Sequence, residues 1–327
     1  MKVCSVIVTY GDRFHLLKQV IEACYKEGVD KVIVIDNASE ENSKKKLQKL
    51  DKNEDRLKVI YLDENTGSAG GYKRGLQEAY KCEECEYILT LDDDNIISQN
   101  SLKSIKNLFN YLNRYKDNIM LAMYRPIWND NEISIYYGDI KTQNIQINNF
   151  MAFNFTNYIK HIFSKIIKPK KNKLLHPLQP IMYNEMGGLI FSKKILNQVG
   201  YPFEPFYLYT DDIEFTYRFT KSGGKIFICS EITIDDIDMT YSDGEKQISY
   251  FDKEFSEFKM YYLLRNRAYF SKKFKSNNLL FYGNGLFLSL LFFKNIFKTS
   301  PNLFFRRYKL FLKAVHDGLN NNMGQRY

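Results

Sequence analysis

The sequence predicts an α/β protein built around a parallel sheet. In the first hundred residues, short apolar runs of strand length alternate with segments whose apolar residues recur at helical spacing. The apolar runs are nearly continuous, as in strands that are buried on both faces. The chain has 327 residues, 44% of them hydrophobic, which suffices for one large or two modest domains. We therefore expect the functional groups at the carboxyl ends of the strands.

The elements of this first part follow from their periodicity and from the turns between them. Tyr10, Gly11, Asp12 and Arg13 form a turn after the first strand, and Asp36 and Asn37 end the second. The expected strands are residues 2–9, 31–35, 57–61 and 87–91, and the expected helices are 14–26 and 44–50.

Three adjacent carboxylates, Asp92, Asp93 and Asp94, follow the last of these strands. Neighbouring carboxylates repel one another and raise each other's pKa, and a divalent cation relieves this repulsion with the oxygen ligands it prefers. Alternate residues of an extended chain point the same way, so Asp92 and Asp94 can share one cation while Asp93 faces elsewhere. The alternative is a solvated acidic turn.

A glycine-rich stretch precedes the acidic one. Gly67, Gly70 and Gly71 allow close approach of a ligand to the backbone, and a helix starting near Gly70 offers free N–H groups to phosphate. Lys73 and Arg74 add cationic donors. The stretch fits neither the Gly-Lys-Ser/Thr phosphate loop nor the dinucleotide fingerprint. A simple turn is the alternative.

Asp36, at the end of the second expected strand, can accept hydrogen bonds from a base or a ribose. Its alternative role is to cap the helix expected over residues 38–50.

The net charge of +9, from 47 basic and 38 acidic side chains, favours an anionic partner such as a nucleotide, a pyrophosphate or an anionic membrane face. Nucleic acid is disfavoured, because no run of arginine and aromatic residues resembles a known reader. Because residues 1–8 lead directly into the first expected strand, we expect no signal peptide. Cys82 and Cys85 have zinc or redox spacing but lack a second pair or a nearby His, so we expect five reduced cysteines in a cytoplasmic protein.

Four motifs resemble, in sequence and order, those of family-2 glycosyltransferases: residues 6–10 (VIVTY), 35–39 (IDNAS), 65–71 (NTGSAGG) and 91–94 (LDDD). The resemblance implies an inverting enzyme of the GT-A fold, in which a nucleotide-binding sheet is fused to an acceptor-binding subdomain. It implies a nucleotide-sugar donor and a divalent metal. The glycine-rich motif with Arg74 and the three aspartates are most similar to the bacterial galactofuranosyl- and rhamnosyltransferase branch.

The resemblance also implies roles for individual residues. Asp92 and Asp94 would bind Mn²⁺ or Mg²⁺. Asp36 and Thr9 would hold the base, and Asn65, Gly67 and Arg74 would line the ribose, pyrophosphate or sugar. With Asp93, the expected donor-binding residues are Thr9, Asp36, Asn65, Gly67, Arg74 and Asp93.

The middle of the chain has a less regular pattern. An amphipathic helix is expected over residues 98–112 and a strand over 120–126, whereas the pattern of residues 128–157 predicts no element. A basic helical pattern over residues 158–175 suits a membrane surface, an anionic acceptor or a lid over the donor. Residues 184–191 place a glycine pair before a strand, which in the family forms the floor of the acceptor pocket.

Asp211 and Asp212 stand at the start of another expected helix. By themselves they are consistent with caps, since a helix N-terminus favours anions. The resemblance matches Asp212 to the catalytic base and gives Asp211 a place in acceptor binding. Glu214 and Arg218 are expected to pair one turn apart.

After a strand at residues 225–229 the relatives place a metal-binding His, but this chain has none there. Asp238 or Asp236 is expected to substitute, since carboxylates suit manganese and magnesium. The alternative is a metal held by Asp92, Asp94 and the donor pyrophosphate.

Two features mark the C-terminal part. Residues 261–267 resemble a helix of the same branch, whose Arg265 and Arg267 meet either phosphate or the core. Residues 278–293 are uncharged, rich in Leu and Phe and short of a membrane span, with basic residues following. They are read as an in-plane amphipathic segment at a membrane or as a helical dimer interface.

The sequence thus predicts a donor-binding half at residues 1–98, an acceptor-binding half at 99–240 and a helical region at 241–327. The expected activity is transfer of galactofuranose, rhamnose or a similar sugar from a UDP- or dTDP-sugar. The expected acceptor is a glycan or lipid-linked glycan of bacterial surface polysaccharide, at the inner face of the membrane. The alternatives are a nucleotidyltransferase and a catalytically silent carbohydrate-binding relative.

Overall fold

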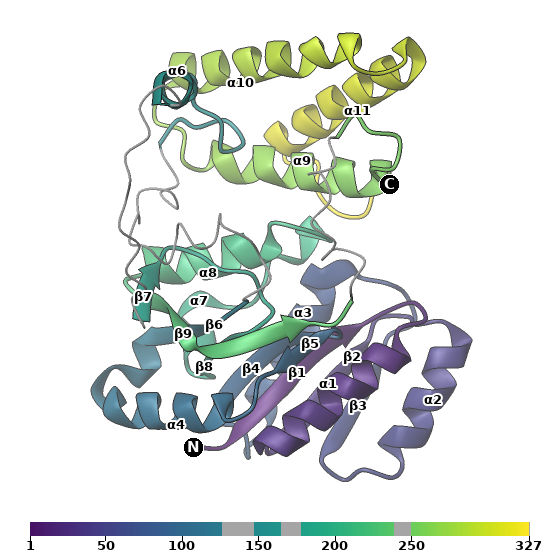
Figure 1. Cartoon of the computed structure of the whole chain (residues 1–327), viewed down its shortest axis with the longest axis vertical. Coiled ribbons are helices and arrows are strands. Elements are labelled where there is room, and N and C mark those ends of the chain that lie inside the picture. The colour runs from purple at the N-terminus through teal and green to yellow at the C-terminus, as the bar shows by residue number, and fades with distance from the viewer. Residues whose placement is uncertain (126–146, 165–177, 239–249, 327) are drawn as a thin grey trace. The chain divides into compact units, whose positions relative to one another are not determined.

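The structure is a computed structural model that describes residues 1–125, 147–164, 178–238 and 250–326. It divides into two compact units. Unit 1 comprises residues 1–143, 174–204 and 211–244, and unit 2 comprises 144–173, 205–210 and 245–327. Figure 1 shows the ribbon of the whole chain.

Unit 1 is built on a mixed sheet, which in the described residues has nine strands in the order β3-β2-β1-β4-β8-β6-β9-β5, with β7 paired to β9. The first four strands by sequence are parallel and are β1 (Val3–Thr9), β2 (Lys31–Asp36), β3 (Leu57–Tyr61) and β4 (Tyr87–Asp92). The others are β5 (Asn95–Ile97), β6 (Ile119–Tyr124), β7 (Leu178–Ile181), β8 (Leu189–Ser192) and β9 (Lys225–Asp236).

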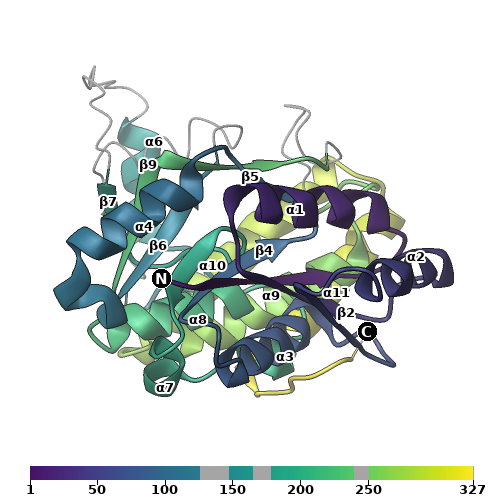
Figure 2. The ribbon, with the colours of Figure 1, turned by 90° about the horizontal axis from the view of Figure 1, so that it is seen from below.

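Helices cover both faces of this sheet (Figure 2). One face packs against α1 (Phe14–Glu27), α2 (Glu41–Asp51) and α4 (Ser101–Tyr111). The other face packs against α3 (Gly67–Lys81), α7 (Ile195–Val199) and α8 (Asp211–Lys221). Short 3₁₀ helices lie at Asn113–Asn118 and Glu204–Phe206. The predicted α/β class is therefore confirmed.

Helix α3 lies unusually close to the sheet because glycines face it. A Cβ at Gly71 would lie 2.6 Å from Val8 Cγ1, and one at Gly75 would overlap the side chain of Val6. The glycine-rich stretch is thus a packing surface as well as the start of a helix. The helix begins at Gly67, three residues before the predicted start.

Unit 2 contains four helices in its described residues: α6 (Phe155–Ser164), α9 (Glu257–Lys272), α10 (Asn278–Phe293) and α11 (Pro301–Leu319). A 3₁₀ turn at Lys294–Phe297 follows α10. A separate core of aromatic and aliphatic side chains joins α9, α10 and α11. The predicted C-terminal helical extension is therefore confirmed. The predicted division of the chain at residue 98 into donor and acceptor halves stays a prediction.

The buried Arg265 and Asn266 of α9 hold a loop of unit 2. Arg265 donates to the carbonyl of Phe206 at 2.8 Å, and the Asn266 amide donates to the carbonyls of Phe206, Leu208 and Tyr209 at 3.0, 2.7 and 2.8 Å. Of the two roles left open for Arg265, packing in the core is the one observed.

Most sequence-predicted elements are present with shifted ends. The strand expected at residues 225–229 continues to Asp236, and β5 was not predicted. Much of the unassigned stretch 128–157, and residues 165–175 of the predicted basic helix, lie outside the described residues.

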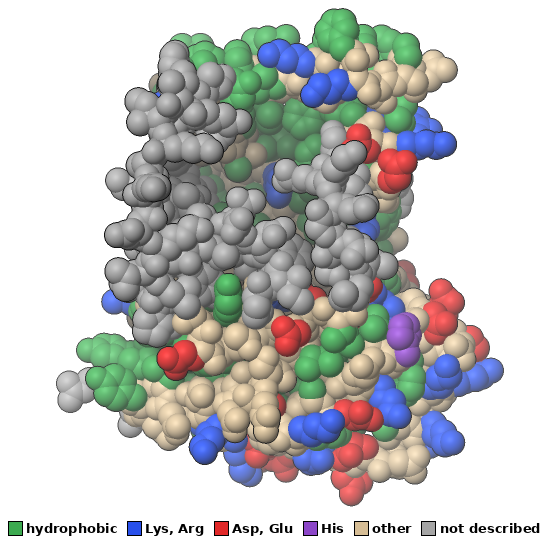
Figure 3. All heavy atoms as spheres, viewed as in Figure 1, with side chains coloured by type: hydrophobic (Ala, Val, Ile, Leu, Met, Phe, Trp, Pro, Cys, Tyr) green, Lys and Arg blue, Asp and Glu red, His purple; other side chains and the backbone are tan. Residues whose placement is uncertain are grey.

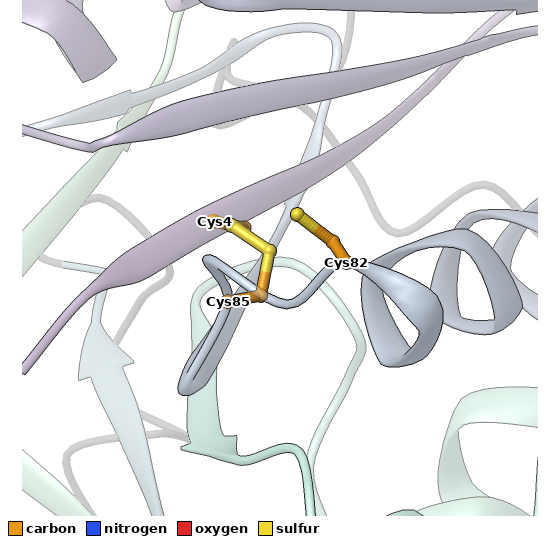
Figure 4. Close-up of side chains that lie close together, drawn as sticks. All are labelled: Cys4, Cys82 and Cys85. Atoms are coloured by element: carbon orange, nitrogen blue, oxygen red, sulfur yellow. A yellow bond between two sulfur atoms is a disulfide. The ribbon is translucent and has the colours of Figure 1, made fainter.

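The cysteines differ from the expectation of five reduced thiols. Cys4 of β1 forms a disulfide with Cys85, which lies just before β4 (Figure 4). The sulfur of Cys82 lies in the same group, in which the three sulfur atoms are within 4.8 Å of one another. Cys82 and Cys85 therefore have a third cysteine beside them. The fold brings Cys4 to them from β1, although it lies 81 residues from Cys85 in sequence.

Candidate active site

The three adjacent aspartates lie where β4 ends, at the carboxyl edge of the parallel strands. The chain then turns into β5, which pairs antiparallel with the end of β9, so that Asn95 lies opposite Asp236. The Ile237 N–H donates to the carbonyl of Asp94 at 2.9 Å. The long β9 therefore brings Asp236 and Asp238 near enough to Asp94 for their charges to act on it. Their expected role as metal ligands stays a prediction.

Arg13 is the centre of one half of this acidic cluster. Its Nε lies 2.9 Å from Asp93 Oδ1, its Nη2 3.1 Å from Asp94 Oδ2, and its Nη1 2.6 Å from Asp238 Oδ2. A planar guanidinium with several donors suits this role. From the sequence, Arg13 was expected only as part of a turn. Its position four residues after the end of β1 is the one sequence feature that places it at the carboxyl edge of the sheet.

Burial raises the pKa of the Asp93 carboxyl to about 7, although Arg13 opposes the shift. The Thr9 hydroxyl donates to Asp93 Oδ2 at 2.7 Å, which also favours the charged form. Thr9 was expected to hold the base of a nucleotide, whereas here its hydroxyl holds Asp93.

Asp92 is held by a different set of residues. The buried Tyr72 hydroxyl donates to Asp92 Oδ1 at 2.7 Å, and Arg125 Nη2 lies 3.8 Å from Asp92 Oδ2. Arg125 also donates to Glu185 at 2.7 Å. The backbone of Gly187 approaches so closely that a Cβ there would lie 2.6 Å from Asp92 Oδ2. A side chain at this position would displace the carboxylate.

The acidic cluster has the chemistry of a divalent-cation site. Burial raises the pKa of Asp94 to about 6, and Asp92, Asp236 and Asp238 add to the shift, against the opposing effect of Arg13. Carboxylate oxygens are the ligands that magnesium and manganese prefer, so the chemistry of these side chains suits a divalent metal. In the structure Arg13 donates to Asp94 and Asp238, and these carboxylates are not among the groups of described residues whose ligand atoms all lie within 4.8 Å of one another.

Asp211 and Asp212 occupy the first turn of α8, as predicted. The Ser68 hydroxyl of α3 lies 3.1 Å from each oxygen of Asp211. Burial raises the pKa of Asp211 to about 7, and Asp92 adds to this shift. Burial, then Asp211 and Glu185, raise the pKa of Asp212 well above its ordinary value, and Asp92 contributes again. The two aspartates of α8 and Asp92 at the end of β4 therefore act on one another electrostatically.

Asp36 is fully buried at the end of β2. Its Oδ1 accepts from the Ser39 N–H at 2.8 Å, while its Oδ2 has no hydrogen-bond partner among the described residues. Helix α2 begins at Glu41 with Glu40 at its N-cap, so the alternative of a cap by Asp36 is wrong. A buried carboxylate oxygen without a partner is costly unless a ligand supplies a donor.

Asn65 and Gly67 shape the entry to α3. Asn65 Oδ1 accepts from the Gly67 N–H at 2.8 Å, and the Asn37 amide donates to the Gly67 carbonyl at 3.0 Å. Arg74 is exposed on α3 and pairs with Glu78 at 3.3 Å, one turn further along the helix. Its expected contact with a donor stays a prediction.

Glu214 and Arg218 form the predicted pair, with Arg218 Nη2 2.8 Å from Glu214 Oε2. Arg218 also donates to the carbonyl of Tyr201 at 3.0 Å. Arg218 thus links α8, which carries the two aspartates in its first turn, to the chain at Tyr201.

Comparison with known sequences identifies one family and one relative. Residues 5–184 match the sequence model of glycosyl transferase family 2. Galactofuranosyltransferase GlfT2 of Mycolicibacterium smegmatis is 29% identical over 174 residues, which are 52% of this chain and 26% of the relative. The chain thus spans about a quarter of the length of this relative.

Two solved structures share the fold. GalNAc-T7, crystallised with UDP, GalNAc and Mn²⁺, gives a TM-score of 0.52 at 12% identity over 72% of this chain and 44% of that one. S. aureus TarS 1–349 in complex with UDP-GlcNAc gives 0.51 at 15% identity over 97% of this chain and 80% of that one. At these identities the likeness establishes the architecture alone.

Proposed function

The chain belongs to glycosyl transferase family 2, and on that premise we propose that it inverts the anomeric centre of a nucleotide-sugar as it transfers the sugar to a glycan or lipid-linked glycan. The observation that carries this proposal is the pair Asp211 and Asp212, whose pKa values are raised in part by Asp92 of the acidic cluster. A general base and a metal site that interact in this way are what such a transfer requires.

Asp212 is the proposed catalytic base. Its raised pKa makes it a better proton acceptor than an ordinary aspartate. It takes the proton of the acceptor hydroxyl while that oxygen attacks the anomeric carbon and the nucleoside diphosphate leaves from the opposite face. Asp211, which accepts a hydrogen bond from Ser68, contributes to acceptor binding.

The residues that would hold Mn²⁺ or Mg²⁺ are Asp92 and Asp94, with Asp238 or Asp236 as a third ligand. The metal would supply neutralisation of the charge that develops on the leaving diphosphate. Arg13 fixes Asp94 and Asp238, and Tyr72 fixes Asp92, so these side chains are oriented before a ligand binds.

For the donor we propose a UDP-sugar, with dTDP-rhamnose as the other candidate. The unpartnered Asp36 Oδ2 suits the imide N–H of a pyrimidine base such as uracil or thymine. Thr9 and Asp93 line the same edge of the sheet, as do Asn65 and Gly67. The match to GlfT2 favours galactofuranose as the sugar, and TarS and GalNAc-T7 are described with UDP-GlcNAc and with UDP.

For the setting we propose the cytoplasmic face of a bacterial membrane, where surface polysaccharides are built on lipid carriers. The net charge of +9 suits both an anionic donor and an anionic membrane face.

The test is incubation of the purified protein with UDP-galactofuranose, UDP-galactose, UDP-glucose and dTDP-rhamnose, with and without Mn²⁺. We expect release of nucleoside diphosphate from one donor, faster with the metal. Release of pyrophosphate from a nucleoside triphosphate would instead favour a nucleotidyltransferase. Donor binding by calorimetry without turnover on any acceptor would favour a silent carbohydrate-binding relative.

Asp94→Ala provides the matched binding test. It should weaken UDP binding in Mn²⁺ and leave metal-free binding little changed, because it removes one ligand and spares Asp36. Equal affinity of the variant and the parent in Mn²⁺ would remove Asp94 from the metal site.

A further inference from the structure

Helix α10 is apolar on all sides, but unit 2 covers only one of them. The covered side contains Phe281, which is fully buried, and Phe292, which stacks on Phe311 at 4.6 Å between ring centroids. In the middle of the helix the buried Asn284 donates to the Asn148 carbonyl at 2.9 Å and accepts from the Phe155 N–H at 2.9 Å. This side therefore belongs to the core of unit 2.

The other side of the helix carries a stripe of large apolar residues that continues through the following 3₁₀ turn. We call it the outer stripe: Leu279, Tyr282, Leu286, Leu290, Phe293 and Phe297. Leu279 is 83% exposed, Leu286 66% and Phe297 90%. The spacing of three and four residues places these side chains on one face of the helix. Isolated exposed leucines are common on protein surfaces, but a continuous stripe marks an interaction surface.

The charges around the outer stripe all have one sign. Between Glu257 and Asp317 the sequence contains no Asp or Glu and twelve Lys or Arg. Lys272 and Lys273 precede α10 and Lys294 and Lys298 follow it, and all four are exposed. Figure 3 shows hydrophobic and basic side chains together at the surface along α10. An apolar stripe with a basic rim fits an anionic partner.

The helix lies along the surface of unit 2 rather than across a membrane. Within the described residues, Asn278–Phe297 is the one helical stretch long and apolar enough to span a bilayer by length and composition. Asn284 and its two backbone partners, however, tie the centre of this stretch to unit 2. A spanning helix would expose this amide and both backbone groups to hydrocarbon, which is costly.

We propose that the outer stripe of α10 inserts, parallel to the surface, into the interface of an anionic lipid bilayer, with the flanking lysines on the lipid headgroups. The sequence left this segment open between a membrane and a dimer. A symmetric dimer through this face would bring together two surfaces with lysines and, from residue 258 to 316, no carboxylate. An anionic bilayer instead supplies the negative charge together with an apolar layer.

This inference extends the proposed function and is tested without it, because vesicle binding requires no sugar transfer. The full chain is sedimented with vesicles of pure phosphatidylcholine and with vesicles containing one third phosphatidylglycerol. We expect strong binding to the anionic vesicles only, weakened by added salt as for other electrostatic contacts.

Two variants separate the apolar and the charged contributions. Leu286→Gln with Leu290→Gln, both at exposed positions, should abolish sedimentation with anionic vesicles. Lys294→Gln with Lys298→Gln should lower the partition coefficient by roughly tenfold or more, since each basic residue near an anionic surface adds to binding. The matched controls are Tyr111→Gln and the pair Lys45→Gln with Lys49→Gln on α2, which has the same four-residue spacing. These controls should bind as the parent does.

Circular dichroism and thermal unfolding of each variant show that it is folded. The proposal is overturned by equal binding of parent and Leu286→Gln/Leu290→Gln protein to anionic vesicles. It is also overturned by absence of parent binding to anionic vesicles. A dimer seen by light scattering and broken by the same leucine variant would then assign the outer stripe to contact between two copies. Either failure leaves the nucleoside diphosphate assay, and hence the proposed sugar transfer, unaffected.

Discussion

In the proposed reaction a single carboxylate, Asp212, accepts the proton of the acceptor hydroxyl. Asp212→Asn should lower kcat by about 10²- to 10⁴-fold, the usual contribution of a general base. Donor affinity should be unchanged, because the amide keeps the shape of the side chain. The measurements are initial rates at saturating donor and UDP-sugar affinity by calorimetry.

The control for this variant is its stability. The folded protein raises the pKa of Asp212 above its unfolded value, so the charged carboxylate destabilises the fold at pH values above the unfolded pKa. An uncharged amide removes that cost, and the variant should unfold at the same or a higher temperature. A lower midpoint together with lost donor binding would make Asp212 a structural residue.

A second prediction concerns pH. The base must be deprotonated to accept a proton, so kcat/KM should fall as pH decreases, and the raised pKa of Asp212 should place this acid limb at a higher pH than an ordinary aspartate would give. After burial, the charge of Asp211 is the largest cause of the raised pKa of Asp212. Asp211→Asn should therefore move the acid limb of the profile to lower pH, as read from kcat/KM across pH. An acid limb at the same pH in parent and variant would argue against this coupling.

At the scale of elements, the loop held by Arg265 and Asn266 gives a stability prediction. Three of its residues, Tyr207, Tyr209 and Thr210, have φ values of 64°, 65° and 69°, in the left-handed region that side chains disfavour. Asn266→Ala removes the amide donor from the carbonyls of Leu208 and Tyr209, whereas the carbonyl of Phe206 keeps the bond from Arg265, and the change should cost about 1–3 kcal/mol. Denaturant unfolding measures the loss. Asn302→Ala, at an exposed position of α11, should cost nothing measurable, and equal effects of the two changes would refute the argument.

The elements that could be predicted are those whose signal is local. The strands β1, β2, β3 and β4 are continuous apolar runs, and the aspartates at their ends follow directly from sequence. The contacts that build the site are not local. Arg13 meets Asp238 across 225 positions of sequence, and β5 forms only because β9 continues far enough to pair with it.

The partners of the site side chains could not be read from the sequence for the same reason. Thr9 and Arg74 were assigned to the donor from the resemblance, which stays a prediction, and in the structure Thr9 donates to Asp93 and Arg74 pairs with Glu78. Tyr72, next to the glycine-rich motif, has the pattern of an ordinary helix residue until α3 packs against β1 and β2, which brings its hydroxyl to Asp92 at the end of β4. No periodicity in the sequence carries that information.

For the molecule as a whole, the bond between Cys4 and Cys85 closes a loop across 81 residues of unit 1. A loop of this length should stabilise the fold by about 4 kcal/mol in the chain-entropy model. The oxidised protein should therefore unfold at higher denaturant concentration than the reduced protein.

The matched control for the disulfide is Cys4→Ala with Cys85→Ala, whose unfolding midpoint should not respond to a reductant. Cys82 remains in this variant, so its reaction with a thiol reagent can be measured in the absence of Cys4 and Cys85. Five titratable thiols in the unfolded, never-reduced parent would show that the bond does not form.

The alternation of the two units along the chain has a consequence for its synthesis. The N–H of Gly324 donates to the carbonyl of Pro205 at 2.8 Å, and Arg265 binds the carbonyl of Phe206. On the ribosome, the six residues that lead into Asp211 thus emerge long before the groups that fix them. The peptide preceding the proposed base therefore takes its final shape only after residue 324 has been made, and a shorter nascent chain would lack the contacts that position it.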